Sequence, residues 1–112
     1  MMEIVSKQLK RVDLVELQGR IDSNVAAQLE ESFEAITEAG RFRIVVDMQK
    51  LEYICSRGLR ALIATLKETR RWNRGDVRLC NVPPRIRGVF DLAGFTPLFK
   101  IYDNAVDAVG SF

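Results

Sequence analysis

The spacing of apolar residues in the first third of the chain predicts two strands and a helix. Residues 4–9 and 12–17 are rich in β-branched and other apolar side chains, which favours two neighbouring strands. Residues 19–24 then supply turn and helix-capping side chains. Apolar residues follow at spacings of four, four and three up to Gly40, as on the buried face of an amphipathic helix. They are Val25, Leu29, Phe33 and Ile36.

Strand and helix patterns alternate through the rest of the chain. Residues 42–48 form a nearly continuous apolar run, typical of a central strand covered on both faces. A loop at 51–56 precedes a helix predicted from Arg57 to Trp72, with Ser56 at the N-cap position. The remaining predicted elements are a strand at 77–82, a helix opened by Pro83 and Pro84 and ended by Gly94, a strand at 98–102, and a short helix capped by Asp103 and Asn104 through Val109.

This order predicts an α/β fold with a mixed, mostly parallel sheet of about five strands and about four helices. The chain of 112 residues has the length of one domain, residues 1–112, with no linker or repeat. Binding sites in such sheets collect at the carboxyl ends of strands and the amino ends of helices. Two segments meet that description, residues 19–24 and residues 53–58.

Composition removes several classes of function. The chain has no histidine, and its two cysteines, Cys55 and Cys80, are 25 positions apart. Catalysis by Ser-His-Asp or Cys-His and most zinc sites are therefore excluded, and small apolar packing is the expected use of both cysteines. The apolar runs are too short to span a bilayer, and no basic stretch followed by an apolar one begins the chain. We expect a cytoplasmic protein without membrane insertion.

Charge is distributed unevenly although the net charge is only +2. Residues 57–87 hold nine Lys or Arg and two acids, whereas glutamates gather on the first predicted helix. One basic face would come from the second long helix; its members are Arg60, Lys67, Arg71 and Arg74. A solvated face is the ordinary explanation, and docking on an acidic partner is the alternative. Nucleic acid is disfavoured because no aromatic platform accompanies the charges.

Ser56 is the strongest candidate for chemistry. A serine at the start of a helix lies beside unpaired backbone N–H groups and the positive end of the helix dipole, where a phosphate is stabilised. The competing explanation is that Ser56 is only an N-cap, which serine favours by about 1 kcal/mol.

The chain resembles STAS domains of the anti-sigma factor antagonist type. In that family a strand and short loop lead to Asp-Ser-Ser/Thr/Ala-Gly-Leu at the start of a helix, and residues 44–62 follow this pattern. Further matches are Gly19-Arg20-Ile21-Asp22 after the second strand, residues 77–82, and residues 89–95. The resemblance covers nearly the whole chain.

The resemblance implies a bacterial transcription regulator that works by binding, with no catalytic residue, metal or cofactor of its own. The unphosphorylated domain would bind an anti-sigma factor, a serine kinase of the histidine-kinase-like ATPase fold, and phosphorylation at Ser56 would break that complex until a phosphatase restores it. The implied partner-binding residues are Asp22, Asn24, Cys55, Ser56, Arg57, Gly58 and Arg60. The alternative is a STAS subunit of a sensory complex or a lipid-transport ATPase that binds without phosphorylation.

Two residues depart from the family pattern. Cys55 replaces the usual aspartate, and Arg57 replaces a small residue. Because a cation in the first turn opposes the helix dipole, we hypothesise that Arg57 pairs with Asp22 or with a phosphate on Ser56. Cys55 could alternatively be a redox-sensitive thiol, activated by the helix start and Arg57.

Two further alternatives rest on other residues. An enzyme using Cys55, Ser56 and Asp22 would handle phosphate or redox chemistry, but it lacks a histidine base and a glycine-rich phosphate loop. An apolar patch near the C-terminus would suit a partner or a weak homodimer, although core packing is the commoner use of such side chains; it comprises Phe95, Leu98, Phe99 and Phe112. Packing is likewise the expected role of Trp72.

Overall fold

The computed structural model describes residues 3–112, and in this range the predicted order of strands and helices is confirmed. The strands are β1 (Ile4–Gln8), β2 (Asp13–Ile21), β3 (Arg43–Ile54), β4 (Asp76–Cys80) and β5 (Lys100–Tyr102). The helices are α1 (Ser23–Glu38), α2 (Ser56–Arg70), α3 (Pro84–Leu92) and α4 (Ala105–Gly110), with single 3-10 turns at Arg71–Asn73 and Thr96–Leu98.

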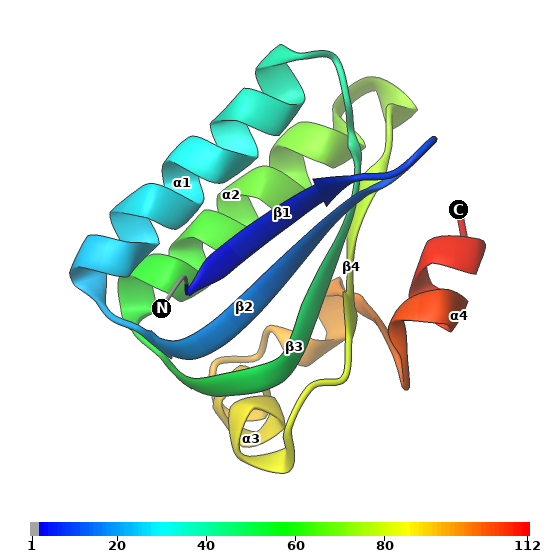
Figure 1. Ribbon diagram of the computed structural model, residues 1–112. Helices are drawn as coiled ribbons and strands as arrows, with labels where there is room; N and C mark the ends of the chain where they lie inside the picture. The colour runs from blue at the N-terminus through cyan, green and yellow to red at the C-terminus, as the bar shows by residue number, and fades with distance from the viewer. Residues whose placement is uncertain (1–2) are drawn as a thin grey trace.

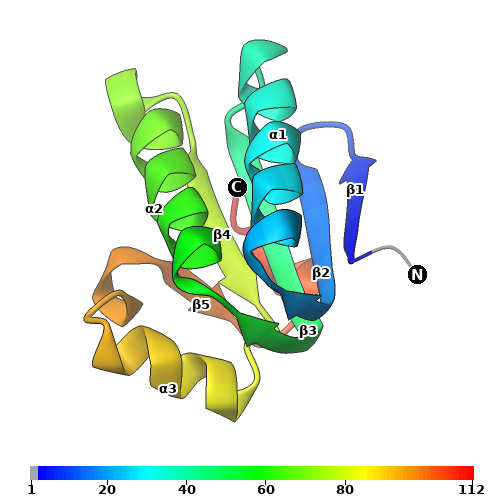
Figure 2. The same cartoon turned by 90° about the vertical axis from the view of Figure 1, so that its left-hand side faces the viewer.

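The five strands form one sheet in the order β1-β2-β3-β4-β5. β1 is antiparallel to β2, and the other neighbours are parallel, so β3 lies at the centre as its apolar run predicts. Helices α1 and α2 lie side by side on one face and α4 covers the other, while α3 lies beyond the carboxyl ends of the central strands (Figures 1 and 2). No helix among residues 3–112 has the length and apolar character that crossing a bilayer requires.

Two hydrophobic clusters hold these layers together. The larger one joins the sheet to α1, α2 and α3, and it includes all four apolar residues predicted for the first helix. The smaller one lies between the sheet and α4 and contains Val12, Val45, Cys80 and Ala108. Cys80 is fully buried, as expected of a small core residue, whereas Cys55 is half-buried against the larger cluster; both thiols are free.

Strands β2 and β3 are longer than the sequence indicates, which corrects the loop predicted at 51–56. β2 continues through Gly19 to Ile21, and β3 pairs with it as far as Ile54. Two shifts of register interrupt the pairing, one of them beside Gly19 at φ 69°. These bulges interrupt the two-residue alternation of buried and exposed side chains. The sequence pattern at the ends of β2 and β3 therefore resembles that of turns.

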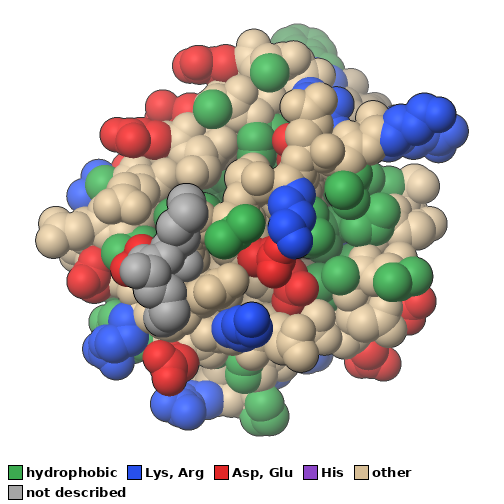
Figure 3. All heavy atoms as spheres, viewed as in Figure 1, with side chains coloured by type: hydrophobic (Ala, Val, Ile, Leu, Met, Phe, Trp, Pro, Cys, Tyr) green, Lys and Arg blue, Asp and Glu red, His purple; other side chains and the backbone are tan. Residues whose placement is uncertain are grey.

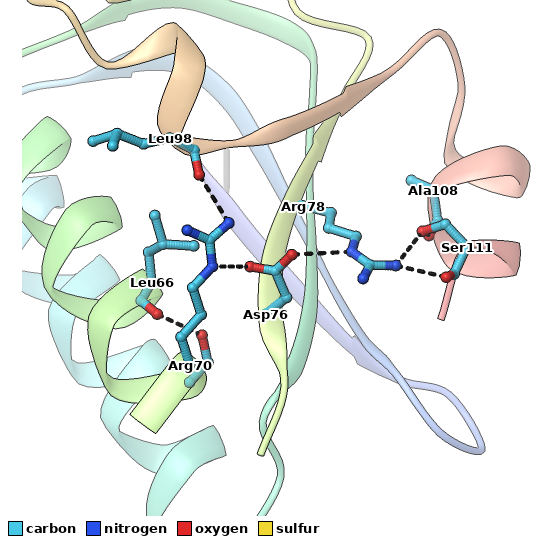
Figure 4. A network of polar contacts seen from close by, with 8 residues as sticks. Leu66, Arg70, Asp76, Arg78, Leu98, Ala108 and Ser111 are labelled. Atoms are coloured by element: carbon cyan, nitrogen blue, oxygen red, sulfur yellow. Dashed lines mark hydrogen bonds and ion pairs between the residues drawn. The ribbon is translucent and has the colours of Figure 1, made fainter. Parts of the chain in front are cut away.

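A buried aspartate on β4 connects three layers of the fold (Figure 4). Asp76 accepts hydrogen bonds from the guanidinium groups of Arg70 on α2, at 2.8 Å, and Arg78 on β4, at 3.1 Å. Arg70 also donates to the carbonyl of Leu98 and Arg78 to the carbonyl of Ser111. Because one carboxylate organises both arginines, α2, β4 and the C-terminal segment are fixed relative to one another.

Candidate functional site

The carboxyl ends of β2 and β3 bring the two segments selected from the sequence together. Ile21 pairs with Ile54, and the amide of Cys55 donates to the carbonyl of Ile21 at 2.9 Å. The next residues along each strand, Asp22 and Cys55, therefore directly precede two neighbouring helices at the same edge of the sheet, and Ser56 follows Cys55. This edge is the candidate site.

Asp22 and Cys55 are the two N-caps at this edge. Asp22 caps α1, since its Oδ1 accepts from the amide of Val25 at 3.0 Å. The N-cap of α2 is Cys55 rather than Ser56, which corrects the sequence-based assignment, and the Cys55 side chain makes no capping hydrogen bond. The helix begins one residue earlier than predicted because β3 runs on to Ile54 and leaves a single residue between strand and helix.

Ser56 is consequently the first residue of α2, and it is exposed. No acidic residue lies in the first turn of this helix. The first backbone amides of α2 and the helix dipole therefore present positive partial charge at this end of the helix. The N-cap side chain supplies no acceptor for these amides. An anion attached to Ser56 would lie in a favourable electrostatic environment.

Gly58 lets the start of α2 approach the strand ends closely. It is buried, and a Cβ at this position would lie 2.7 Å from Cγ1 of Ile54 and 3.3 Å from Cγ2 of Ile21. Only glycine fits without displacing these side chains, which explains physically why glycine stands two residues after the serine. The position of the Ser56 hydroxyl depends on this packing.

Arg57 pairs with a residue that the sequence did not single out. Its Nε donates to Oε2 of Glu30 at 3.0 Å and its Nη2 to Oε1 at 2.9 Å, a bidentate bridge from α2 to α1. These hydrogen bonds lower the pKa of the Glu30 carboxyl and raise that of Arg57. The first arm of the hypothesis, that Arg57 pairs with Asp22, is therefore wrong, because Glu30 binds the Arg57 guanidinium while Asp22 caps α1. Pairing of Arg57 with a phosphate on Ser56 stays a prediction.

Two other predicted site residues lie on the same two helices. Asn24 and Arg60 are exposed, on the first turn of α1 and the second turn of α2. Arg60 also lines a groove of about 670 Å³ between the two helices, whose rim includes Glu30, Glu34 and Glu68. The structure thus places one basic and several acidic side chains along the groove between α1 and α2.

Sequence reasoning missed two features of this edge. Glu30 was assigned to a solvated acidic face, and only its place two turns along α1 from Asp22 could have suggested contact with a neighbouring helix. The guanidinium of Arg20 lies 4.4 Å from the ring centroid of Tyr53, a cation–π contact across the ends of β2 and β3. No sequence signal identifies that contact, because it depends on the bulged register of the two strands.

Two charged side chains at this edge are already engaged in contacts within the fold. Within residues 3–112, no three His, Cys, Asp or Glu side chains converge as a set of metal ligands. Asp22 is held as a cap and Arg57 is held by Glu30. What this geometry offers is an exposed hydroxyl on a rigid helix end, flanked by charges that another protein could contact.

Comparisons of sequence and of structure both find proteins described as STAS domains or anti-sigma factor antagonists. The family model described as STAS domain matches residues 3–108. An anti-sigma factor antagonist of Bordetella bronchiseptica, BtrV, is 35% identical over 96 residues, which cover 86% of this chain and 82% of that protein. An anti-sigma F factor antagonist of Paenibacillus polymyxa is 26% identical over 109 residues, covering 96% and 92% of the two chains.

Solved structures of the Bacillus anti-sigma factor antagonist SpoIIAA have the same fold. The unphosphorylated form has a TM-score of 0.77 and the phosphorylated form one of 0.78, each at 18% identity and over 96% of this chain. These matches cover 94% and 96% of the SpoIIAA chains, so the likeness extends over the whole domain.

Proposed function

Because this chain belongs to the STAS domain family and, within it, to the anti-sigma factor antagonists, we propose that it binds an anti-sigma factor and so frees a sigma factor for RNA polymerase. The observation that carries this proposal is the exposed Ser56 at the uncapped start of α2. The relatives named anti-sigma factor antagonists support the class of partner. Such a function belongs in the bacterial cytoplasm.

Phosphorylation of Ser56 is the proposed control. The anti-sigma factor, a serine kinase of the histidine-kinase-like ATPase fold, transfers the γ-phosphoryl group of ATP to Oγ of Ser56; the hydroxyl loses its proton and ADP leaves. The serine gains about 1.5 to 2 negative charges, which opposes docking through repulsion and desolvation. A phosphatase would hydrolyse the ester and restore binding, and a solved phosphorylated form of SpoIIAA supports this scheme.

Arg57 gives the proposed phosphate a neighbouring cation. A phosphate on Ser56 would compete with the Glu30 carboxylate for the Arg57 guanidinium, since it carries more charge and more acceptor oxygens. Release of Glu30 would change the charge pattern between α1 and α2 as well as at Ser56. The switch would therefore alter two helices of the docking surface.

The test is the intact mass of the chain after incubation with ATP, magnesium and each anti-sigma factor kinase of its own organism. We expect one added phosphate, absent from Ser56→Ala. Ser23→Ala is the matched control, because Ser23 is the exposed first residue of α1 and should leave the reaction intact. Phosphate that persists in Ser56→Ala would contradict the proposed site, and a stable complex without phosphate would indicate a binding subunit controlled in another way.

A further inference from the structure

Three loops form a basic surface at the end of the molecule away from Ser56. They are residues 9–12 between β1 and β2, residues 39–43 from the end of α1 to the first residue of β3, and residues 71–75 between α2 and β4. Figure 1 places all three at the amino-terminal edge of the parallel strands, toward the top of the view. Arg41 donates to the carbonyl of Leu9, and the amide of Asp76 donates to the carbonyl of Phe42, so the loops are joined into one surface. We call residues 9–12, 39–43 and 71–75 the loop surface.

Trp72 projects from this surface, which corrects the expectation that it packs in the core. Its side chain is 82% exposed, and its backbone has φ 60° and ψ 23°, a left-handed conformation that is rare for a bulky residue. Arg74 holds the turn: its guanidinium donates to the carbonyls of Glu68 and Arg71 and lies 3.8 Å from the ring centroid of Phe42. The chain thus keeps an indole in solvent at a conformational cost, and such strain is typical of functional segments.

The charges of the loop surface are all positive. Its six charged residues are Lys10, Arg11, Arg41, Arg43, Arg71 and Arg74. Arg41 pairs with Asp13, and Arg71 and Arg74 pair with Glu68. Among residues 3–112, Lys10, Arg11 and Arg43 have no carboxylate within ion-pair distance. These three cations are available to an external anion.

An apolar hollow opens beside two of the free cations. It has a volume of about 290 Å³ and is lined by Leu9, Lys10, Arg11, Val12, Val109 and Phe112. Leu9 is itself 38% exposed. Figure 3 shows basic side chains over the β1–β2 turn with hydrophobic ones gathered next to them. Cations at the rim of an apolar hollow match the chemistry of an anionic amphiphile.

We propose that the loop surface binds the surface of an anionic lipid bilayer, with Trp72 at the level of the headgroups. The three loops protrude from one end and so can touch one plane together, whereas a protein partner would need an apolar pocket for the indole with acidic side chains placed around it to meet the cations. Tryptophan favours the membrane interface, and basic residues are attracted to anionic headgroups. This inference is independent of the proposed phosphorylation, because Ser56 lies at the opposite edge and remains accessible.

The test is sedimentation of the full chain with vesicles of phosphatidylglycerol and phosphatidylcholine in equal parts, compared with vesicles of phosphatidylcholine alone. We expect binding to the anionic vesicles only, weakened by salt. Since Trp72 is the single tryptophan, its fluorescence should shift to shorter wavelength on binding. Each surface cation contributes about fivefold to such partitioning, so Lys10→Gln with Arg11→Gln should weaken it about 25-fold.

The matched control removes the same charge from the other end of the molecule. Arg85 and Arg87 on α3 are exposed, and Arg85→Gln with Arg87→Gln should bind as the wild type does. Trp72→Ala should weaken binding while leaving the thermal unfolding midpoint within about 1 °C, because the indole is exposed and alanine keeps the same backbone conformation. Absence of vesicle binding, equal loss in both charge variants, or an unchanged Trp72 spectrum would overturn the proposal. So would equal binding to both kinds of vesicle.

Discussion

At the scale of single residues, the start of α2 depends on the absence of a side chain at Gly58. The buried glycine lets the helix reach Ile21 and Ile54, and this contact sets the height of Ser56 above the strand ends. Arg57, the next residue back, is held by Glu30 through two hydrogen bonds. The position of the exposed Ser56 therefore depends on the close packing of Gly58 and on the hydrogen bonds that hold Arg57.

Gly58→Ala should lower the free energy of unfolding by about 1 to 3 kcal/mol, because the new methyl group overlaps Ile54. The measurement is urea denaturation. Gly88→Ala is the control, since a Cβ there meets nothing within 4 Å on helix α3 and should stabilise the protein by about 0.5 to 1 kcal/mol. An equal effect of both substitutions would contradict the packing role of Gly58.

Cys80 makes stability depend on pH in the alkaline range. Burial, with a smaller effect from Asp47 and Glu16, raises the pKa of its thiol to about 12, whereas an unfolded chain ionises near about 8.5. Between these values the unfolded chain releases a proton that the folded chain keeps, so stability present below pH ~8.5 falls as pH rises. At pH 10 the wild type should have lost about 2 kcal/mol more than Cys80→Ala, each measured relative to its own stability at pH 7. Parallel stability curves for the two proteins would show that Cys80 is not responsible.

At the scale of elements, the sequence pattern predicted every strand and helix but misplaced the edges that form the site. Amphipathic spacing located α1 and α2 because their buried faces are continuous. The ends of β2 and β3 were missed because paired bulges interrupt the alternation, and one residue of error there moved the N-cap from Cys55 to Ser56. The bridge from Arg57 to Glu30 could not be predicted, since it depends on how two helices lie against each other.

Asp22 lies at an element boundary, and it is also one of the proposed partner-binding residues. Asp22→Ala should cost about 1 kcal/mol of unfolding free energy through loss of the α1 cap, whereas Asp22→Asn should cost little because asparagine caps equally well. Urea denaturation separates the two variants. If the carboxylate also contacts the anti-sigma factor, Asp22→Asn should weaken binding at unchanged stability. Equal stability of the alanine and asparagine variants would contradict the capping role.

At the scale of the whole molecule, the two edges of the sheet carry different surfaces. The carboxyl edge holds Ser56 and the paired Arg57, and the amino edge holds the loop surface with Trp72. The length of the parallel strands separates the two surfaces. The hydrogen bonds around Asp76 hold α2, β4 and the C-terminal segment in fixed positions relative to one another. The sequence showed the excess of basic residues but not that Trp72 stands outside the core, because its left-handed turn has no glycine to mark it.

Removal of the Asp76 carboxylate should weaken the whole domain. Asp76→Ala leaves Arg78, whose side chain is 13% exposed, without its carboxylate partner, and should cost about 3 kcal/mol. Arg70 is half-exposed and adds little, because water can replace its partner. Urea denaturation measures the loss, and Asp91→Ala on the exposed end of α3 serves as the comparison. A loss of less than about 0.5 kcal/mol for Asp76→Ala would contradict a structural role for the network.

The affinity of the anti-sigma factor for this chain, with and without phosphate on Ser56, tests the central claim most directly. Isothermal titration calorimetry on the two purified forms would compare their dissociation constants at the same salt concentration. Repulsion and desolvation at the start of α2 should weaken the phosphorylated complex by about 100-fold or more. Equal affinities of the two forms would contradict the account of Ser56 as the residue that controls binding.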